Sequence, residues 1–110
     1  MTNSSKSKGD RAEIECASLI ADLIGVPVRR KLGAGRLDDT GDLDGVPDHV
    51  IQVCNWARVA EAVSVKPVGA EAQRINAAAG YAATFVRIRG GTWRVVLTPE
   101  QWAAYYQATT

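Results

Sequence analysis

A short acidic and polar stretch, GDLDGVPDHVIQVCNW at residues 41–56, contains the side chains best suited to chemistry. If residues 49–55 form a strand, side-chain alternation puts Gln52 and Cys54 on one face. Mg²⁺ in proteins is held by a few carboxylate and amide oxygens together with water. Asp42 and the Gln52 amide oxygen could supply such ligands from adjacent strands, although a neutral amide binds the ion more weakly than a carboxylate does.

The acids of this stretch also have a simpler explanation. Aspartate commonly flanks glycine and proline in turns, and this favours a turn role for Asp44 and Asp48. For Asp42 the metal-ligand and turn explanations are equally good on pattern alone.

Glu13 is a further candidate, on a predicted helix. Helical spacing places it in line with Ala17, Ile20 and Ile24, the face expected to pack inward. A carboxylate there is costly to bury unless something compensates it, although the helix dipole favours an anion in the first turn. A solvated position at the rim of the face explains Glu13 slightly better, and the pattern leaves both explanations open.

Cys54 has three possible roles. A buried free cysteine is most often a small apolar group; the alternatives are a reactive thiol and a replacement at a former catalytic position. The only histidine, His49, lies five positions before Cys54, and this odd spacing puts the two on opposite strand faces. A cysteine enzyme is therefore the least favoured interpretation.

The basic residues are segregated from these acids, although the net charge is only +1. A net charge this small gives the protein no overall electric field that would attract a polyanion. The simplest explanation of the basic residues is that they are solvated on the surface. Lys66, beside Pro67 at the start of a predicted helix, is also explained most simply in this way. Four cations flank a glycine-rich loop, where they could hold phosphates: Arg29, Arg30, Lys31 and Arg36.

The elements that must position these residues form one layered α/β domain. We expect a flexible tail over residues 1–9 and a single domain over 10–110. Hydrophobic periodicity predicts the order α-β-β-β-α-β-β-α, a mixed sheet with helices packed on it. The predicted helices cover 10–24, 68–79 and the segment after Thr98, and the predicted strands cover 28–31, 42–46, 49–55, 83–88 and 92–97.

Local signals mark several boundaries of these elements. Gly80 is expected to end the second helix. Thr98, Pro99 and Gln101 have the residue types of a capping box at the start of the last helix. Residues 56–65 are ambiguous.

Composition limits the class of protein. The chain has 110 residues, of which 46% are hydrophobic, as expected for a globular domain. Its two cysteines have neither a disulfide framework nor zinc-ligand spacing, and the chain has no apolar leader and no run of membrane-spanning length. We therefore expect a cytoplasmic protein with reduced thiols.

Several segments together resemble a known family. In chain order they are KGDRAE, VPVRRKLGAG, DTGDLDGVP, VIQVCN, AEAQRINAAAG and FVRIRGGTWRVVLTPEQW. They are similar to the small phage and archaeal Holliday junction resolvases of the PD-(D/E)XK nuclease superfamily, especially those of actinobacterial phages. The resemblance extends from Lys8 to Trp102, and the order and spacing of the motifs carry it.

This resemblance implies a restriction-endonuclease-like mixed sheet flanked by helices. It also implies a Mg²⁺- or Mn²⁺-dependent endonuclease that acts on branched DNA, such as a four-way junction, as a homodimer in the cytoplasm of the host cell. In the family, a helical Glu, an Asp before a turn and an E-x-K strand bind metal and activate water.

Two of these residues are present and two are replaced. The helical acid matches Glu13, and the aspartate of GD matches Asp42. The acid of E-x-K falls on Gln52, an auxiliary ligand at best, and its lysine falls on Cys54. Lys66 is the only nearby downstream lysine and could replace it. The replacements leave two hypotheses: an active metal-dependent endonuclease, or a nuclease fold that only binds DNA or a protein partner.

Overall fold

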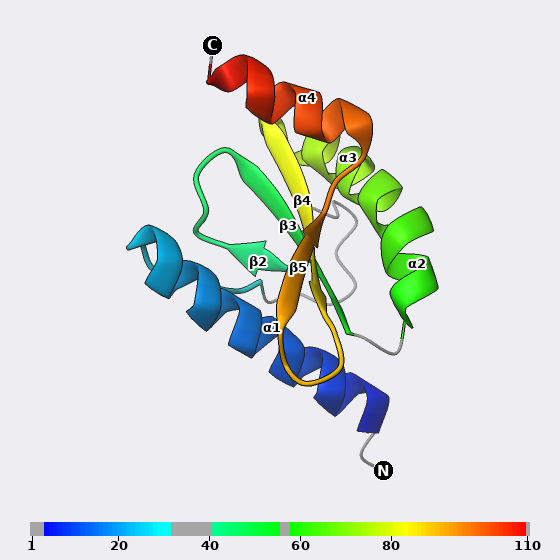
Figure 1. The fold of residues 1–110 in the computed structure, drawn as a ribbon. Coiled ribbons are helices and arrows are strands. Elements are labelled where there is room, and N and C mark those ends of the chain that lie inside the picture. The colour runs from blue at the N-terminus through cyan, green and yellow to red at the C-terminus, as the bar shows by residue number, and fades with distance from the viewer. Residues whose placement is uncertain (1–3, 32–40, 56–57, 110) are drawn as a thin grey trace.

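The computed structural model describes residues 4–31, 41–55 and 58–109, which form a mixed α/β arrangement (Figure 1). A three-stranded sheet contains β3 (His49–Asn55), β4 (Tyr81–Arg87) and β5 (Trp93–Val96), and a two-stranded sheet contains β1 (Arg29–Arg30) and β2 (Leu43–Asp44). The helices are α1 (Ser4–Ile24), α2 (Val59–Ser64), α3 (Lys66–Ala77) and α4 (Pro99–Ala108). The α/β class predicted from the sequence is confirmed.

The central strand of the larger sheet is β4, which is parallel to β3 and antiparallel to β5. At the other edge of β3, the Asp42 N–H donates to the carbonyl of Ile51 over 2.9 Å. The smaller sheet therefore lies against the edge of β3, and this contact brings residue 42 level with the middle of that strand.

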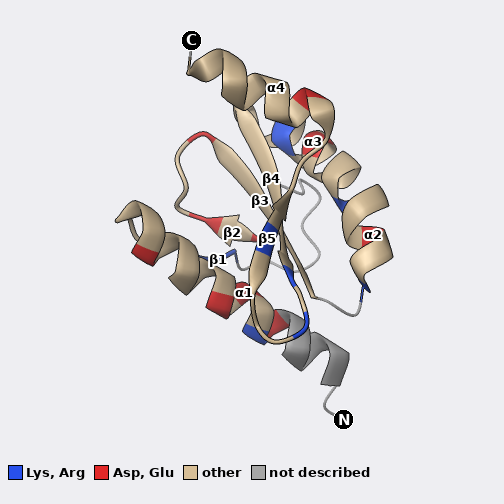
Figure 2. Ribbon diagram, in the orientation of Figure 1, with Lys and Arg blue, Asp and Glu red and all other residues tan. Residues whose placement is uncertain are grey.

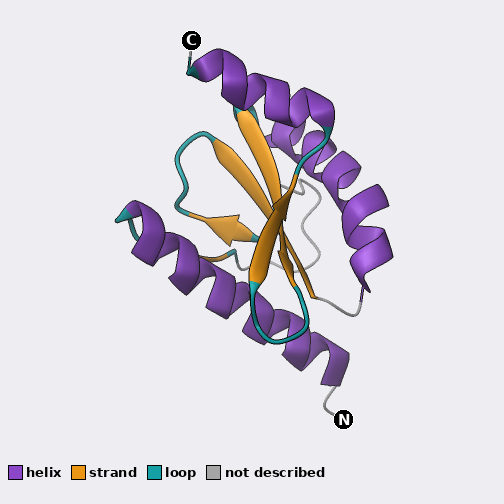
Figure 3. Cartoon of the chain, in the orientation of Figure 1, coloured by secondary structure: helices purple, strands orange, loops and turns teal. Residues whose placement is uncertain are grey.

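Side-chain alternation along β3 separates two layers of core. Ile51 and Val53 pack with Ala12 and Cys16 of α1. On the opposite face, Val50 packs with Ala70 of α3, and Cys54 packs with Ala62 of α2. The sheet is thus covered by α1 on one face and by α2 and α3 on the other (Figure 3).

The last helix begins as the sequence predicts. The Thr98 hydroxyl accepts a hydrogen bond from the Gln101 N–H, and the Gln101 side chain accepts one from the Thr98 N–H. The Gln101 amide group also donates to the carbonyl of Pro67 over 3.0 Å, so the same residue ties α4 to α3.

Several boundaries differ from the prediction by a few residues. Helix α1 begins at Ser4 rather than at residue 10, because a glycine at position 9 costs only about 1 kcal/mol inside a helix. Residues 59–64, within the ambiguous segment, form α2. Helix α3 ends at Ala77, and the next residue, Ala78, caps it in the left-handed conformation (φ 52°), so Gly80 is not the residue that terminates it.

Asp48 connects the start of β3 to the start of β4. Its carboxylate accepts a hydrogen bond from the Gly80 N–H over 2.7 Å, and its carbonyl accepts one from the Tyr81 N–H over 3.0 Å. Asp48 has a φ of 61°, and a Cβ at position 80 would collide with its carboxylate. The turn role expected for Asp48 is confirmed, and this pair is called the Asp48–Gly80 clasp below.

No helix in the described ranges is long and apolar enough to cross a membrane.

Candidate functional site

Asp42 is fixed at the edge of β3. Its Oδ2 accepts a hydrogen bond from the Val53 N–H over 2.9 Å, while its own N–H bonds the Ile51 carbonyl. These two bonds bracket Gln52 and place the Asp42 carboxylate beside it. The carboxylate is only partly exposed, so Asp42 is more than a solvated turn residue.

Glu13 approaches the same edge from α1. Its side chain is 24% exposed, and burial together with the charge of Asp42 raises its pKa from 4.5 to about 7. The nearby cation Arg30 opposes this increase without cancelling it. The structure therefore brings together the two carboxylates that sequence analysis singled out, and the charge of Asp42 disfavours ionisation of Glu13.

Arg30 lies between Glu13 and a second acid of α1. Its Nη1 is 3.7 Å from Asp10 Oδ2, and its Nε is 3.9 Å from Glu13 Oε1. The Nε is buried and makes no hydrogen bond to any described residue. Sequence analysis assigned Arg30 to phosphate binding and missed Asp10, because only the pairing of β1 with β2 brings this arginine to α1. Figure 2 shows the acidic positions along α1.

Gln52 is 5% exposed and points toward α2 and α3, away from α1. Its amide oxygen is buried and makes no hydrogen bond to the described part of the chain. An unsatisfied buried polar group costs about 1–3 kcal/mol. Residue 52 lies next to Asp42 along the strand edge, since the backbone groups of its two neighbours bond Asp42.

Cys54 is 4% exposed, and its thiol lies 3.6 Å and 3.7 Å from the carbonyl oxygens of Asn55 and Arg58. Burial raises its pKa, and the cation Lys66 opposes that change only in part. A buried, protonated thiol is a poor nucleophile. The structure therefore argues against a cysteine enzyme.

His49 lies on the opposite face from Cys54, as predicted. Its Nδ1 is 2.8 Å from the Pro47 carbonyl. Its ring lies 5.1 Å and 5.7 Å from the rings of Tyr81 and Tyr105. His49 is thus part of an aromatic cluster at the far end of the sheet and is not a partner for the thiol.

Lys66 is the first residue of α3, two positions before the start that the sequence predicted. Its Nζ is 4.0 Å from Glu61 Oε1, and its side chain is 29% exposed. Its charge lowers the pKa values of both Glu13 and Cys54, against the dominant effect of burial. Lys66 therefore belongs to the electrostatic environment of the site.

The predicted phosphate-binding cations divide into three groups. Arg29 is exposed on β1, and Arg30 faces the acids of α1. Lys31 lines a polar pocket of about 360 Å³ that also contains Asp44 and Asp48. Arg36 and the glycine-rich loop lie outside the described residues, as does Trp56.

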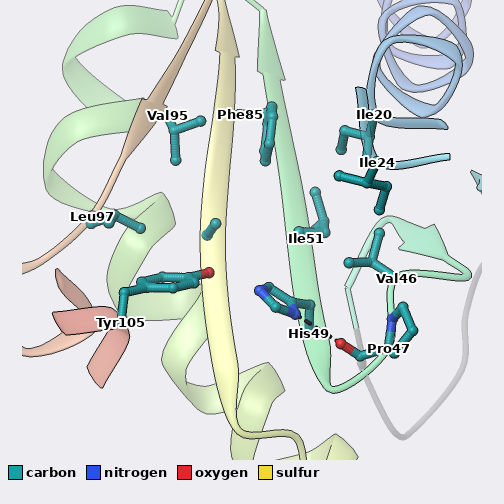
Figure 4. Close-up of a pocket in the computed structure, with 11 residues that line it drawn as sticks. Ile20, Ile24, Val46, Pro47, His49, Ile51, Phe85, Val95, Leu97 and Tyr105 are labelled. Atoms are coloured by element: carbon teal, nitrogen blue, oxygen red, sulfur yellow. Dashed lines mark hydrogen bonds between the residues drawn. The ribbon is translucent and has the colours of Figure 1, made fainter. Parts of the chain in front are cut away.

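A larger pocket, of about 510 Å³, lies elsewhere (Figure 4). Its wall is apolar and comes from α1, from the three strands of the larger sheet and from α4, with Ile20, Phe85 and Tyr105 among its residues. Neither this pocket nor the polar one is lined by Glu13, Asp42 or Gln52.

The other tryptophans have structural or surface positions. The Trp93 indole N–H donates to Glu15. Trp102 is 58% exposed, and its ring lies 5.5 Å from that of Tyr106.

Comparison with family models, with curated proteins and with solved structures found no match to this chain.

The chemistry available at the edge of β3 follows from its oxygen atoms. Glu13 and Asp42 supply two carboxylates, the hard oxygen groups that Mg²⁺ binds together with water, whereas the Gln52 amide points to the other face of the sheet. Within the described ranges, no three His, Cys, Asp or Glu side chains are grouped closely enough to hold a metal ion.

Proposed function

We propose that the protein is a Mg²⁺- or Mn²⁺-dependent endonuclease that acts on branched DNA, with a restriction-endonuclease-like fold of the PD-(D/E)XK type. The observation that carries this proposal is the meeting of Glu13 and Asp42 at one strand edge, with a raised pKa at Glu13. A carboxylate whose pKa is raised by burial and by a nearby like charge is typical of functional sites.

The topology supports the same proposal. A helix that carries an acid is followed by three strands, by helices that cross over, and by a strand parallel to the third. The resemblance of the sequence to Holliday junction resolvases implies this order and assigns the metal to Glu13, Asp42 and position 52.

Glu13 and Asp42 fit a hydrated divalent cation, since their carboxylates meet at one strand edge, and Gln52 is the neighbouring residue of that strand. When bound, Mg²⁺ lowers the pKa of a coordinated water and neutralises charge on phosphate. Asp42, fixed by the Val53 N–H, would hold the cation. Glu13 would have to lose its proton to join it, and Gln52 would be at most an auxiliary, uncharged ligand.

The missing motif lysine is the weakest part of the site. Cys54 is buried against α2 and cannot supply a cation. The positive charge of Lys66 lowers the pKa values of both Glu13 and Cys54, so it acts on this part of the molecule. We therefore assign to Lys66 the role of stabilising the negative charge on the phosphate. Arg29, Lys31 and Arg36 would hold neighbouring phosphates, and a homodimer would present two such sites to a junction.

Cleavage of a labelled four-way DNA junction with Mg²⁺ and with Mn²⁺ tests this proposal, with Asp42→Ala as the negative control. Metal-dependent cutting that disappears in the control is the expected result. A linear duplex of matching sequence measures the preference for branched DNA.

A second function is favoured by one observation, the burial of an uncharged thiol where the family has its lysine. Such a protein would bind junctions without cutting them. Salt-sensitive junction binding without cleavage would mark this outcome, and Gln52→Glu combined with Cys54→Lys would then be the change to test for restored cutting.

A further inference from the structure

A buried polar pair interrupts the apolar layer under α2 and α3. Gln52 and Thr84 are register partners on the parallel strands β3 and β4. Their side chains are 5% and 0% exposed. Both the Gln52 Oε1 and the Thr84 Oγ1 are buried, and neither has a hydrogen-bond partner among the described residues.

This pair separates two apolar clusters on the same face of the sheet. One cluster contains Val50, Ala70 and Ala82, and the other contains Cys54, Ala62 and Val86. Two apolar residues at positions 52 and 84 would join these clusters into one core. Packing alone therefore does not account for a hydroxyl and an amide at this point.

The chemistry of the two groups is complementary. The threonine hydroxyl has one proton to donate, and the glutamine oxygen accepts hydrogen bonds. They are adjacent in register, yet they are not directly bonded. One water held between them would satisfy both, as internal waters commonly do in polar sites with several partners.

We propose that Thr84 is a positioning residue for Gln52 and acts through one enclosed water that fixes the orientation of the Gln52 amide beside Asp42. The consequence for metal binding rests on the proposed function. Asp42, Gln52 and Thr84 form a row across three neighbouring strand segments, so the hydroxyl acts from the side of Gln52 opposite Asp42.

The test is the hydrogen exchange of the Gln52 side-chain amide, measured by NMR in the full chain without metal. Gln52→Ala identifies the resonance by its loss. The Gln101 amide, which bonds Pro67 and Glu71, is the internal reference. Thr84→Val removes the hydroxyl and retains the branched shape, whereas Thr84→Ser retains the hydroxyl.

We expect exchange at Gln52 to accelerate about tenfold in Thr84→Val, to stay near the wild-type rate in Thr84→Ser, and to stay constant at Gln101 in both. An unchanged Gln52 rate in Thr84→Val overturns the inference, and so does equal acceleration at Gln101. Thermal unfolding establishes that each variant is folded, and Thr84→Ala replaces Thr84→Val if the latter does not fold.

Mn²⁺ titration of the wild-type protein by calorimetry separates this inference from the proposed function. Accelerated exchange in Thr84→Val combined with no Mn²⁺ binding supports the positioning role and contradicts the metal site. Mn²⁺ binding combined with an unchanged exchange rate leaves the proposed function in place and removes Thr84 from it.

Discussion

The Val53 N–H donates to Asp42 Oδ2 over 2.9 Å, and this bond holds a carboxylate against the edge of β3. Movement of Asp42 would leave a buried strand amide without a partner, so the charge stays where it acts on Glu13. The high pKa of Glu13 follows from burial and from this fixed neighbour. Folding and protonation of Glu13 are therefore coupled at one strand edge.

Replacing Glu13 by Gln should remove a pH-dependent loss of stability. The folded pKa of about 7 lies above the ordinary value of 4.5, so the folded chain holds this proton more tightly than the unfolded chain does. The resulting stabilisation is complete below pH 4.5 and is lost as the pH rises to about 7.

Each unit of pKa corresponds to about 1.4 kcal/mol in the free energy of unfolding. Because Gln resembles protonated Glu, Glu13→Gln should flatten this slope and be the more stable protein at about pH 8. Urea unfolding across the pH range measures the effect, with Asp22→Asn on the exposed side of α1 as the control. Equal slopes in Glu13→Gln and the wild type would contradict the prediction.

Divalent cations should stabilise the protein more at high pH than at low pH. A cation needs ionised Glu13, so Mg²⁺ competes with the proton and should lower the pKa of that residue. At a Mg²⁺ concentration of about 100 times Kd, the expected gain is about 2.7 kcal/mol.

Asp42→Asn is the matched variant for this prediction, since its amide oxygen can still accept from the Val53 N–H. It should keep the fold and lose the gain in melting temperature. Scanning calorimetry with Mg²⁺ or with Ca²⁺ measures both proteins. A gain of equal size in Asp42→Asn would place the cation elsewhere.

Lys66→Ala should reduce junction cleavage by roughly a hundred- to a thousandfold, the usual effect of losing one electrostatic group from a transition state. The affinity for the junction should change little, because Lys66 is only one of several cations that would contact phosphates. Single-turnover kinetics separates the two effects. Arg58→Ala is the control, since Arg58, like Lys66, pairs with Glu61; unchanged cleavage in Lys66→Ala removes this lysine from the mechanism.

Both cysteines should resist alkylation in the native protein at neutral pH. Burial raises the pKa of Cys16 to about 12 and that of Cys54 above its ordinary value, so little thiolate is present. Mass spectrometry after brief iodoacetamide treatment, with a denatured sample as reference, measures this resistance. Rapid native labelling of Cys54 would revive the cysteine-enzyme interpretation.

Local signals predicted the parts of the fold that depend on neighbouring residues. Thr98 and Gln101 indicated a capping box, and alternation along residues 49–55 assigned Gln52 and Cys54 to the same face. The start of α1 was placed too late, because one glycine does not end a helix, and α2 lies in a segment that the sequence left ambiguous.

The contacts of the site were harder to predict because they are not local. The sequence around Arg30 contains no signal that strand pairing will bring this residue to Asp10 and Glu13. Thr84 has no special neighbours in an apolar strand, and its register with Gln52 depends on a crossover of two helices. The pairing of Glu13 with Asp42 was anticipated only through a resemblance to known nucleases.

The Asp48–Gly80 clasp gives this fold a reference point from which positions along both parallel strands are counted. Gln52 lies four residues after Asp48 in β3, and Thr84 lies four residues after Gly80 in β4. The two residues are therefore neighbours on the parallel strands. Inserting one residue after Asp48 would turn every later β3 side chain to the opposite face. The distance in sequence between a turn and a polar residue is thus as much a part of this site as the residue itself.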